Sequence, residues 1–461
     1  MIKEKGQAAL VIIFVLGIIS VLIGVSLQKT GYVESVMGRN NENSLKAFYI
    51  ANSGVEEAIY RIQLDSSFGY PSPGSFDLDV GEGKVEVEVT GSDENERIIE
   101  SVGTWENYVR RVRVLVYNTS FKPGFIDAIH AGLGGVEIRN NSRVMGMEDA
   151  DGNVYSKSFI KGAKNDYSLV SGECKTSASA IYGSAYAVET ITKLADNDSG
   201  VCVMKDANAE FLDNCFVVGS AISPNTPPID CPHLGEWVDD EPPPERDLPE
   251  MGVGTMKKFL DAKGEKFSGD CILDGSGGAD DCSDGTNQIG TIKIEGNLIK
   301  PQNVDIVVSG PVWVTGDIIF ESNSEIALGD VTTSQMVVSD GKIESNSNIS
   351  YLPKEITDDE GNVTKAFLLF ISTYDSGLES DDPLFCDDEA ISLFSNNNSV
   401  LFYSTEGCIL VNANSNFHGA ILGEGIRVDN NSEVEYDPDL QGAIFGLTKS
   451  GGWQTIEFEE Y

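Results

Sequence analysis

The first 28 residues of the chain, MIKEKGQAALVIIFVLGIISVLIGVSLQ, place a short charged leader directly before a long uncharged segment. The segment Gly6 to Gln28 contains roughly 20 apolar residues, and at about 1.5 Å per residue a helix of this length crosses the ~30 Å hydrocarbon core of a bilayer. A secretory signal has a shorter apolar region and a small-residue cleavage site, and neither is present. The sequence therefore predicts a retained helix that can span a membrane.

The residues on both sides of the boundary between the leader and the apolar segment resemble a known family. Lys5-Gly6 followed by Gln7-Ala8-Ala9-Leu10, with the segment ENSLKAFYIANSGVEEAIYRI that ends at Ile62, is similar to the N-terminus of type IV prepilins and, among them, of the PilX class of minor pilins. The resemblance covers about the first 120 residues. It implies that a prepilin peptidase cuts between Gly6 and Gln7. It also implies other pilins and the pilus assembly machinery as partners.

The same resemblance gives a location and a position in the filament. The precursor would lie in the inner or cytoplasmic membrane, and the assembled protein at the cell surface or in an extracellular pilus. Major pilins carry Glu at the fifth position after the cut, where this chain has Val11. Family members without that carboxylate are often proposed to sit at the filament tip. A minor pilin or pseudopilin at the tip is thus favoured over a shaft subunit, and an uncleaved membrane anchor outside any filament is the alternative.

Charge and cysteine content limit the partners and cofactors. Asp and Glu number 73 against 32 Lys and Arg, so the net charge of −41 argues against a nucleic-acid partner. The carboxylates could hold calcium, although a solvated acidic surface is the favoured interpretation. An even number of cysteines in an exported chain predicts disulfides, and the lack of C-x-x-C spacing together with only three histidines argues against a zinc site. The cysteines are Cys174, Cys202, Cys215, Cys231, Cys271, Cys282, Cys386 and Cys408.

Residues 83–118 change from helical to strand periodicity. Val85, Val87 and Val89 alternate with polar residues, and the valines of the segment 109–116 behave in the same way. Gly91 to Asn95 has turn composition, and a third apolar run, Arg97 to Val102, ends at Gly103. These segments predict a small antiparallel sheet on which one face of the preceding helix packs. The residues of that face recur at helical spacing: Ile50, Ser53, Gly54, Val55, Ala58 and Ile62.

A repeated pattern follows from about residue 120. Each copy has a glycine, alternating aliphatic residues and an Asn-Ser pair, as in HAGLGGVEIRNNSRV from His130 and HGAILGEGIRVDNNSEV from His418. The repeated asparagines are Asn141, Asn323, Asn346, Asn398, Asn414 and Asn431. Gaps of 16, 17 and 23 residues between neighbours fit one coil of three short strands, roughly 20 residues long. The pattern predicts a right-handed parallel β-helix, and an antiparallel β-sandwich with Asn-Ser hairpins is the alternative.

Asparagine suits the corners of such coils because it accepts positive φ more readily than other non-glycine residues, and stacked amides can hydrogen-bond between coils. We therefore expect strained φ at the repeated asparagines. The flanking aliphatic residues are expected to fill the interior: Val136, Ile138, Val144, Ile318, Phe320, Ile326, Ile343, Ile349, Ile426, Val428 and Val434.

The predicted organisation is a leader (1–6), a transmembrane or filament-core helix (7–28), a pilin-like helix and sheet (29–119) and a β-helix-like domain (120–461). The last includes an irregular, cysteine-containing insertion at about 150–300. Three consecutive prolines between Asp239 and Gly252 predict a stiff exposed connection, followed by a short helix over Thr255 to Ala262. The run Asp274 to Asp284 reads as a loop closed by Cys271 and Cys282 or, alternatively, as a calcium loop.

No nucleophile elbow, phosphate loop or metalloprotease signature is present, and no catalytic residue stands out. The leading hypothesis is a non-enzymatic, adhesive minor pilin or pseudopilin that displays a β-helix to a surface glycan or a protein receptor. Two alternatives remain. One is a membrane-tethered polysaccharide hydrolase or lyase, because parallel β-helices host such enzymes, and the other is an envelope-anchored scaffold without a filament.

Overall fold

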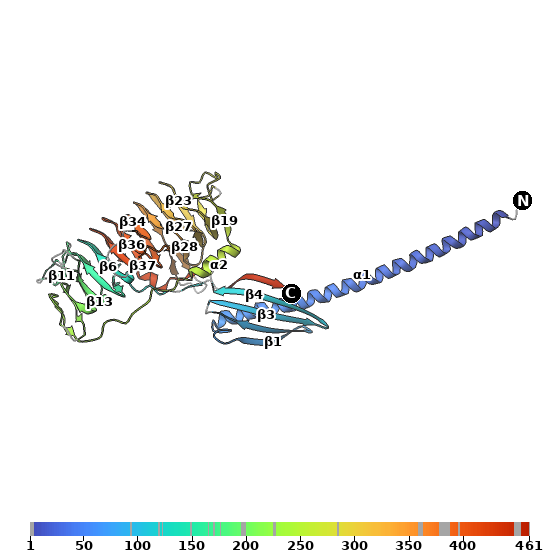
Figure 1. Cartoon of the computed structure of the whole chain (residues 1–461), viewed down its shortest axis with the longest axis horizontal. Helices are drawn as coiled ribbons and strands as arrows, with labels where there is room; N and C mark the ends of the chain where they lie inside the picture. Colours follow the sequence, from blue (N-terminus) through green and yellow to red (C-terminus); the bar gives the residue numbers. More distant parts are fainter. Residues whose placement is uncertain are drawn as a thin grey trace. The chain divides into compact units, whose positions relative to one another are not determined.

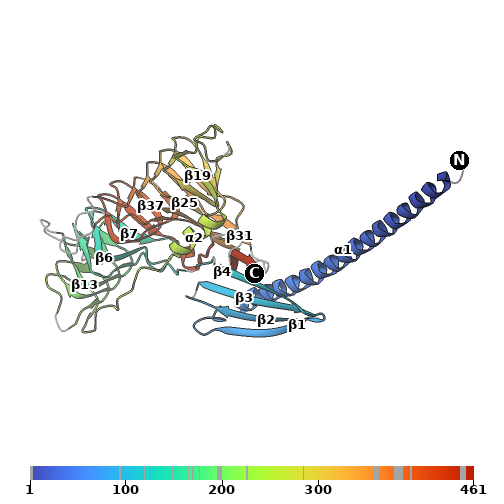
Figure 2. The same ribbon diagram turned by 45° about the vertical axis from the view of Figure 1, so that its right-hand side comes forward.

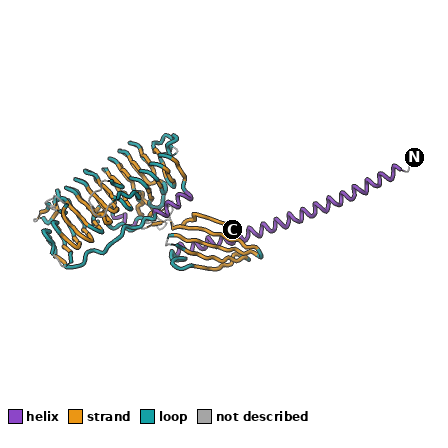
Figure 3. Tube along the Cα trace, in the orientation of Figure 1, coloured by secondary structure: helices purple, strands orange, loops and turns teal. Residues whose placement is uncertain are grey.

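The computed structural model describes residues 4–92, 95–118, 120–121, 123–147, 150–164, 166–168, 171–175, 177–194, 200–224, 227–283, 285–357, 363–377, 388–394, 397–446 and 453–460. The fold is mainly β, with one long N-terminal helix and many sheets (Figures 1 and 3). The chain forms two compact units. Unit 1 comprises Met1–Tyr117 and Trp453–Tyr461, and unit 2 comprises Asn118–Gly452.

Unit 1 begins with the helix α1 (Glu4–Leu64), which is 61 residues long. Residues 12–35 of α1 have exposed side chains. Among the described residues α1 is the only helix long and apolar enough to cross a membrane. Its C-terminal part is different, because burial starts at Ala47 and continues at helical spacing to Ile62. One helix therefore combines an uncovered apolar half with a half that packs in a core.

The sheet of unit 1 has five strands in the order β1-β2-β3-β4-β40. β1 pairs with β2, β2 with β3 and β3 with β4, all antiparallel. The strands are β1 (Gly74–Val80), β2 (Gly83–Thr90), β3 (Glu96–Trp105), β4 (Tyr108–Asn118) and β40 (Trp453–Glu460). The sequence predicted β2, β3 and β4, and it predicted neither of the two outer strands, β1 and β40. The predicted domain boundary is wrong at the C-terminus, since residues 453–460 form an edge strand of unit 1 and not part of unit 2.

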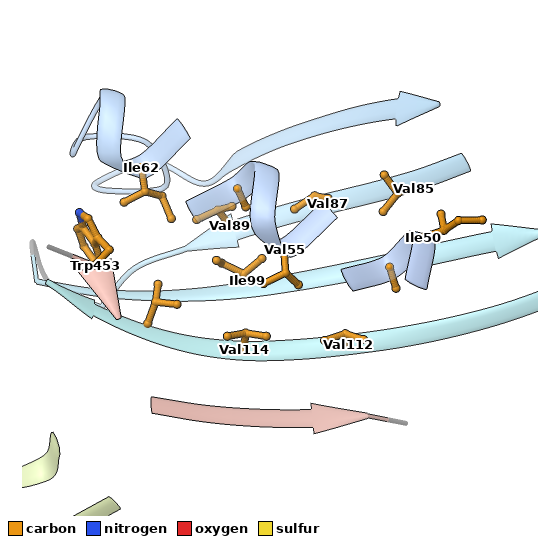
Figure 4. Close-up of a cluster of buried hydrophobic side chains, with 13 residues drawn as sticks. Ile50, Val55, Ile62, Val85, Val87, Val89, Ile99, Val112, Val114 and Trp453 are labelled. Atoms are coloured by element: carbon orange, nitrogen blue, oxygen red, sulfur yellow. The ribbon is translucent and has the colours of Figure 1, made fainter. Parts of the chain in front are cut away.

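The core of unit 1 lies between α1 and the sheet (Figure 4). Ile50, Val55 and Ile62 face Val85, Val89 and the other buried valines of β2 and β4. The predicted helix face is correct except for Ser53, which is half-exposed and donates its hydroxyl hydrogen to Tyr49 O (2.9 Å). Ala47 and Ala51 complete the face. Small residues bring the helix backbone against the sheet, and Ser101 Oγ donates to Ala51 O at 2.7 Å.

Unit 2 consists of short strands stacked in parallel ladders. Its first part contains β5 (Ser120–Phe121), β6 (Ile129–Ile138), β7 (Arg143–Gly146), β8 (Val154–Ser156), β9 (Phe159–Gly162), β10 (Tyr167–Ser168), β11 (Glu173–Cys174), β12 (Ala180–Ile181), β13 (Ala185–Lys193), β14 (Cys202–Val203), β15 (Ala207–Leu212), β16 (Phe216–Val217), β17 (Ala221–Ile222) and β18 (Trp237–Val238). The segment 239–252, here called the strap, and the helix α2 (Val253–Lys263) follow.

The second part of unit 2 contains β19 (Glu265–Ser268), β20 (Cys271–Ile272), β21 (Gln288–Ile289), β22 (Ile292–Glu295), β23 (Leu298–Lys300), β24 (Ile306–Val308), β25 (Val312–Val314), β26 (Ile318–Phe320), β27 (Ser324–Leu328), β28 (Gln335–Ser339), β29 (Ile343–Ser345), β30 (Ile349–Leu352), β31 (Lys354–Thr357), β32 (Val363–Ala366), β33 (Leu368–Ser372), β34 (Ile391–Leu393), β35 (Asn397–Ser404), β36 (Cys408–Val411), β37 (Asn416–Val428), β38 (Glu433–Tyr436), the 3-10 helix η1 (Pro438–Gly442) and β39 (Phe445–Gly446).

The spatial order of the strands differs from their order in the chain. One ladder runs β19-β22-β25-β28-β33-β35-β37-β6-β8-β13-β15-β17-β18. At its middle Ile421 pairs with Ile129 and Ile426 with Val136, so the second part of the chain stacks on the first (Figure 2). The strap and α2 connect the two ends of this stack. Their combined length of about 60 Å, from extended and helical rises, matches 13 strands spaced about 4.8 Å apart.

The interior of unit 2 contains every aliphatic or aromatic residue predicted for it, from Val136 to Val434. Aromatic rings also contact one another there: Phe320 meets Phe370 edge to face with centroids 5.3 Å apart, and Phe370 stacks on Phe402 of the paired strand β35 with centroids 5.4 Å apart. The prediction of an irregular insertion at 150–300 is wrong for much of that range. Its strands are short and rich in alanine, as at Ala185 and Ala207, so the large apolar residues that would reveal the alternation are missing.

Disulfides connect Cys174 with Cys202, Cys215 with Cys231, and Cys271 with Cys282. Cys408 is also disulfide-bonded, and Cys386 lies outside the described residues. The helix expected over residues 255–262 is α2, and three of its side chains, Met256, Phe259 and Leu260, are buried. These cross-links hold loops onto a stack whose individual strands are only a few residues long.

Candidate functional site

Three places in the molecule were singled out by the sequence or stand out in the structure. The first is the N-terminal segment with Gly6, Gln7 and Val11. These residues lie in α1, and their side-chain environment is outside the described part of the chain. The cleavage site and the missing carboxylate at Val11 therefore stay predictions.

The second place is a set of asparagines with left-handed backbone. Asn141, Asn323, Asn414 and Asn431 have φ of 62°, 59°, 64° and 61°. In all four the next residue is a serine with a buried side chain, Ser142, Ser324, Ser415 and Ser432. The chain turns sharply at each of these positions and enters the following strand.

The prediction of a left-handed corner is wrong for two of the six asparagines, Asn346 and Asn398. The left-handed residue of the third repeat is Asn348, with φ of 60°, and not Asn346. The reason is the register, since Ser324 pairs with Ile349 and so Asn323 is level with Asn348. The Asn-Ser pair at Asn346 matched the motif two residues too early, and the buried Ile349 was the signal that could have located the turn. Asn398 lies within the strand β35.

The left-handed asparagines form rows of amides. Asn141 Nδ2 donates to Asn431 Oδ1 at 2.9 Å, and Asn431 Nδ2 donates to Asn414 Oδ1 at 3.2 Å. A second pair joins Asn348 Nδ2 to Asn323 Oδ1 at 3.1 Å. Beside the first row lies an open depression of about 360 Å³, lined by Asn141, Arg143, Ser177, Asn431, Ser432 and Glu433. The side of the stack thus offers evenly spaced polar groups to an outside partner.

The amide rows give a matched pair of substitutions. Asn348→Val is expected to lower the free energy of unfolding by about 1 to 3 kcal/mol, because a β-branched residue is strained at positive φ. Asn346→Val is expected to change it by less than about 0.5 kcal/mol, as for an ordinary surface site. Urea titrations of the two variants measure the difference. Equal losses would show that the left-handed backbone is not what Asn348 contributes.

The third place is a buried polar cluster beneath the strap. Arg246 Nη1 lies 3.0 Å from Asp127 Oδ2, and the Arg246 guanidinium is 3.8 Å from the ring centroid of Tyr155. Tyr155 Oη accepts from the Arg246 backbone N–H at 2.6 Å and donates to Pro244 O at 3.0 Å. His130 Nε2 is 3.3 Å from Arg246 O. Lys157 Nζ adds an ion pair with Asp247 at 2.7 Å.

Burial sets the protonation of this cluster. Desolvation raises the pKa of Asp127, while the charge of Arg246 acts in the opposite direction. Desolvation also lowers the pKa of His130 to about 4; the hydrogen bond to Arg246 O acts in the opposite direction, and the charges of Arg246 and Lys157 lower the pKa further. His130 is therefore neutral at pH 7. No local motif marks these residues, because Asp127 and Arg246 are far apart in sequence and meet only where the strap crosses the stack.

His130 makes the stability of unit 2 depend on pH. Its folded pKa of about 4 is below the value of about 6.5 for an unfolded chain, so the unfolded state takes up the proton first as the pH falls. The stabilising contribution of neutral His130 is complete above pH 6.5 and is lost as the pH falls toward 4. At about 1.4 kcal/mol per pKa unit, we expect the free energy of unfolding to drop by about 2 kcal/mol between pH 7 and pH 5.

The raised pKa of Asp127 has the opposite sign and offsets part of this loss at the acid end, because a folded state that holds its proton gains stability as the pH falls. Urea titrations at both pH values, read by hydrogen exchange of unit 2 peptides, measure the drop. His130→Gln is expected to reduce it. An identical drop in His130→Gln would contradict the assignment.

Metal ligands do not gather in the described residues, where no group of three His, Cys, Asp or Glu side chains could hold an ion. In the proposed calcium loop Asp281 accepts hydrogen bonds from the backbone of Gly277 and Ser283, both at 2.9 Å. Asp284 lies outside the described residues. The loop therefore uses its one buried carboxylate to hold its own backbone.

Comparisons with known proteins find a similarity among solved structures. No protein-family model matches the chain, and no curated protein matches it. Among solved structures, the chain is similar to the crystal structure of the competence-associated pilin ComZ from Thermus thermophilus, at 13% sequence identity, with 91% of this chain and 98% of that chain covered and a TM-score of 0.25. A TM-score of this size does not define a shared fold.

Proposed function

We propose that the chain is a minor type IV pilin or pseudopilin whose second unit is a right-handed parallel β-helix, displayed near the filament tip for surface adhesion or assembly. The observation that carries this proposal is the construction of α1. A single helix of 61 residues has an uncovered apolar half next to a half that packs on an antiparallel sheet. The leader at Lys5-Gly6, which resembles a prepilin cleavage site, immediately precedes the apolar half.

The β-helix assignment is supported by the pairing in unit 2. The main ladder is parallel at every described pairing from β19 to β18, whereas a sandwich of hairpins would pair consecutive strands antiparallel. The amide rows support it as well, because they need turns stacked directly above one another. These features favour a solenoid over the sandwich.

A tip position follows from crowding and charge. Unit 2 is much larger than unit 1, and copies at every step of a shaft would bring acidic surfaces together at close range. Val11 provides no carboxylate for pairing with a neighbour's N-terminal amine. We accordingly propose other pilins, the assembly machinery, the prepilin peptidase and the membrane as partners, with a surface glycan or protein as receptor and without nucleic acid. No resident cofactor is proposed, although the acidic side chains could hold calcium.

The location proposed is the inner or cytoplasmic membrane for the precursor and the cell surface or an extracellular pilus for the assembled protein. A tethered polysaccharide-cleaving enzyme would need paired carboxylates whose pKa values are pushed apart in a cleft. The depression beside the amide row has one carboxylate, Glu433. The other alternative, an envelope scaffold without a filament, predicts that the chain is absent from purified filaments, and the following experiment tests this.

The experiment removes unit 2 while keeping unit 1 whole. Residues 119–452 are replaced by a short Gly/Ser linker so that Trp453–Glu460 still completes the sheet beside β4. Attachment is expected to fall while membrane insertion persists, and labelled full-length protein is expected at filament ends. Uniform labelling of the shaft, unaffected attachment, or absence of the chain from purified filaments would refute the proposal.

The cleavage site is tested separately. N-terminal sequencing of surface material is expected to begin at Gln7. Gly6→Val is expected to block the cut, because a side chain there would obstruct the close approach of the peptidase. Gly17→Val, deeper in the same helix, is the matched control and is expected to be cut normally. A mature chain that begins at Met1, or far beyond Leu27, would exclude the pilin assignment.

A further inference from the structure

A cavity of about 380 Å³ lies in unit 2 between the strap and the side of the stack. Tyr186 of β13 and Asn208 of β15 are on one side, and Pro243 and Pro244 of the strap are on the other. Asp127 and Arg246 form its end wall and also line a smaller adjoining cavity of about 170 Å³. The larger volume is in the range of about 300 to 1,000 Å³ typical of small-molecule sites.

Asn208 is the most informative residue of this cavity. It pairs with Tyr186 on one side and with Ile222 on the other, so no neighbouring amide can bond to it as in the rows of left-handed asparagines. Its Oδ1 is buried and has no hydrogen-bond partner among the described residues. Buried acceptors without a donor are rare in folded proteins. A ligand with an O–H or N–H group would supply the missing donor.

Asn153, which also lines the cavity, offers the complementary group. Its Oδ1 accepts from the Ser184 backbone N–H at 2.8 Å, which fixes the amide and leaves Nδ2 without a partner among the described residues. The two amides therefore present one acceptor, on Asn208, and one donor, on Asn153. A hydroxyl group satisfies both kinds of site, because it donates one hydrogen bond and accepts others.

The other lining residues and their charges limit the class of ligand further. Tyr186 and the two prolines are apolar or aromatic, which suits a ligand with one C–H face and one hydroxyl-bearing edge. The only charges in the lining, Asp127 and Arg246, already form an ion pair. The strap carries further acidic residues, among them Glu245 and Asp247, which repel anions. The ligand expected is neutral.

We propose that this cavity is a binding site for a neutral sugar of one or two pyranose rings, held by Asn153 and Asn208 and packed against Tyr186. The ring would lie between the side of the stack and the strap. The site belongs to unit 2 alone, so it does not depend on assembly of the chain into a filament. It also lies apart from the depression beside Asn141 and Asn431.

The test uses the full chain in a detergent without a sugar head group. Glucose, galactose, N-acetylglucosamine, maltose and lactose are titrated by saturation-transfer NMR, with glucuronate as the anionic comparison. At least one neutral sugar is expected to bind with a Kd of millimolar or below, at least tenfold tighter than glucuronate. Binding of none of the five, or equal binding of glucuronate, would overturn the proposal.

Variants locate the site. Asn208→Ala is expected to lower the affinity at least tenfold without lowering Tm, because the amide oxygen that it removes makes no hydrogen bond to the described protein. Asn208→Leu keeps the side-chain volume, removes the acceptor and is expected to lose the sugar as well. Glu210→Ala, exposed on the same strand and outside the cavity, is the matched control. Undiminished binding in both Asn208 variants would place the sugar elsewhere and overturn the assignment.

Discussion

Replacing Gly103 with Leu is expected to separate the C-terminal half of α1 from the sheet of unit 1. A Cβ at Gly103 would lie 2.3 Å from Ala47 O and 2.4 Å from Ala51 N. Both are backbone atoms of the helix, so no side-chain rotation relieves the clash. Overpacking of this kind costs about 1 to 3 kcal/mol in a core that can adjust. Here the rigid helix, which carries Ile50 and Val55, must move away from the buried valines of the sheet, and we expect a loss of about 3 to 5 kcal/mol.

Urea unfolding of the full chain, read by hydrogen exchange of peptides from α1 and β3, measures this loss. Gly38→Ala is the matched control on the same helix, since nothing lies within 4 Å of the Cβ it adds and alanine favours helix by about 1 kcal/mol. The control is expected to be neutral or stabilising. A loss for Gly103→Leu no larger than that of a surface substitution would mean that α1 does not touch β3 as described.

Arg246→Met is expected to destabilise unit 2 by about 3 to 5 kcal/mol, the cost of removing one partner of a buried ion pair. Asp127 is 5% exposed and would keep a carboxylate whose partner is gone. Tyr155 would lose the guanidinium that packs on its ring at 3.8 Å. The strap would then be held more weakly. We expect faster proteolysis within residues 239–252, measured by limited digestion, together with the loss in urea stability.

A second substitution identifies the cause. Asp127→Asn combined with Arg246→Met removes both charges, and the double variant is expected to recover much of the lost stability. Lys205→Met, which breaks an exposed ion pair with Asp151, is the control and is expected to cost less than about 1 kcal/mol. A double variant that is as unstable as Arg246→Met alone would show that the charge of Asp127 is not the source of the loss.

The parts of the fold that the sequence predicted depend on local periodicity. The long helix, three strands of unit 1 and the interior aliphatic residues of unit 2 follow from the spacing of apolar side chains, which burial on one face imposes. Residues such as Ile318 and Val428 could be assigned for that reason. Left-handed turns were recognised where Asn precedes a buried Ser, and Asn348 was missed because it precedes Ile349.

The features that the sequence did not predict depend on contacts between distant parts of the chain. Nothing near Trp453 indicates that β40 lies beside β4, and nothing near Ile129 indicates that β37 pairs with β6. The short alanine-containing strands around Ala185 and Ala207 lack a readable alternation. The cluster of Asp127, His130, Tyr155 and Arg246 exists only because the strap crosses the stack at this point. The sequence identified the strap as stiff and gave no indication of what it covers.

The pairing of β37 with β6 has a consequence for biosynthesis. One edge of β6 has no partner until β37 leaves the ribosome, about 290 residues after Ile129. At about 5 to 20 residues per second, the nascent chain presents this unpaired edge for roughly 15 to 60 s. Unit 1 likewise waits for β40, which follows β4 only after the whole of unit 2. An unpaired strand edge invites aggregation, so we expect the growing chain to need chaperones until β37 and β40 have been synthesised.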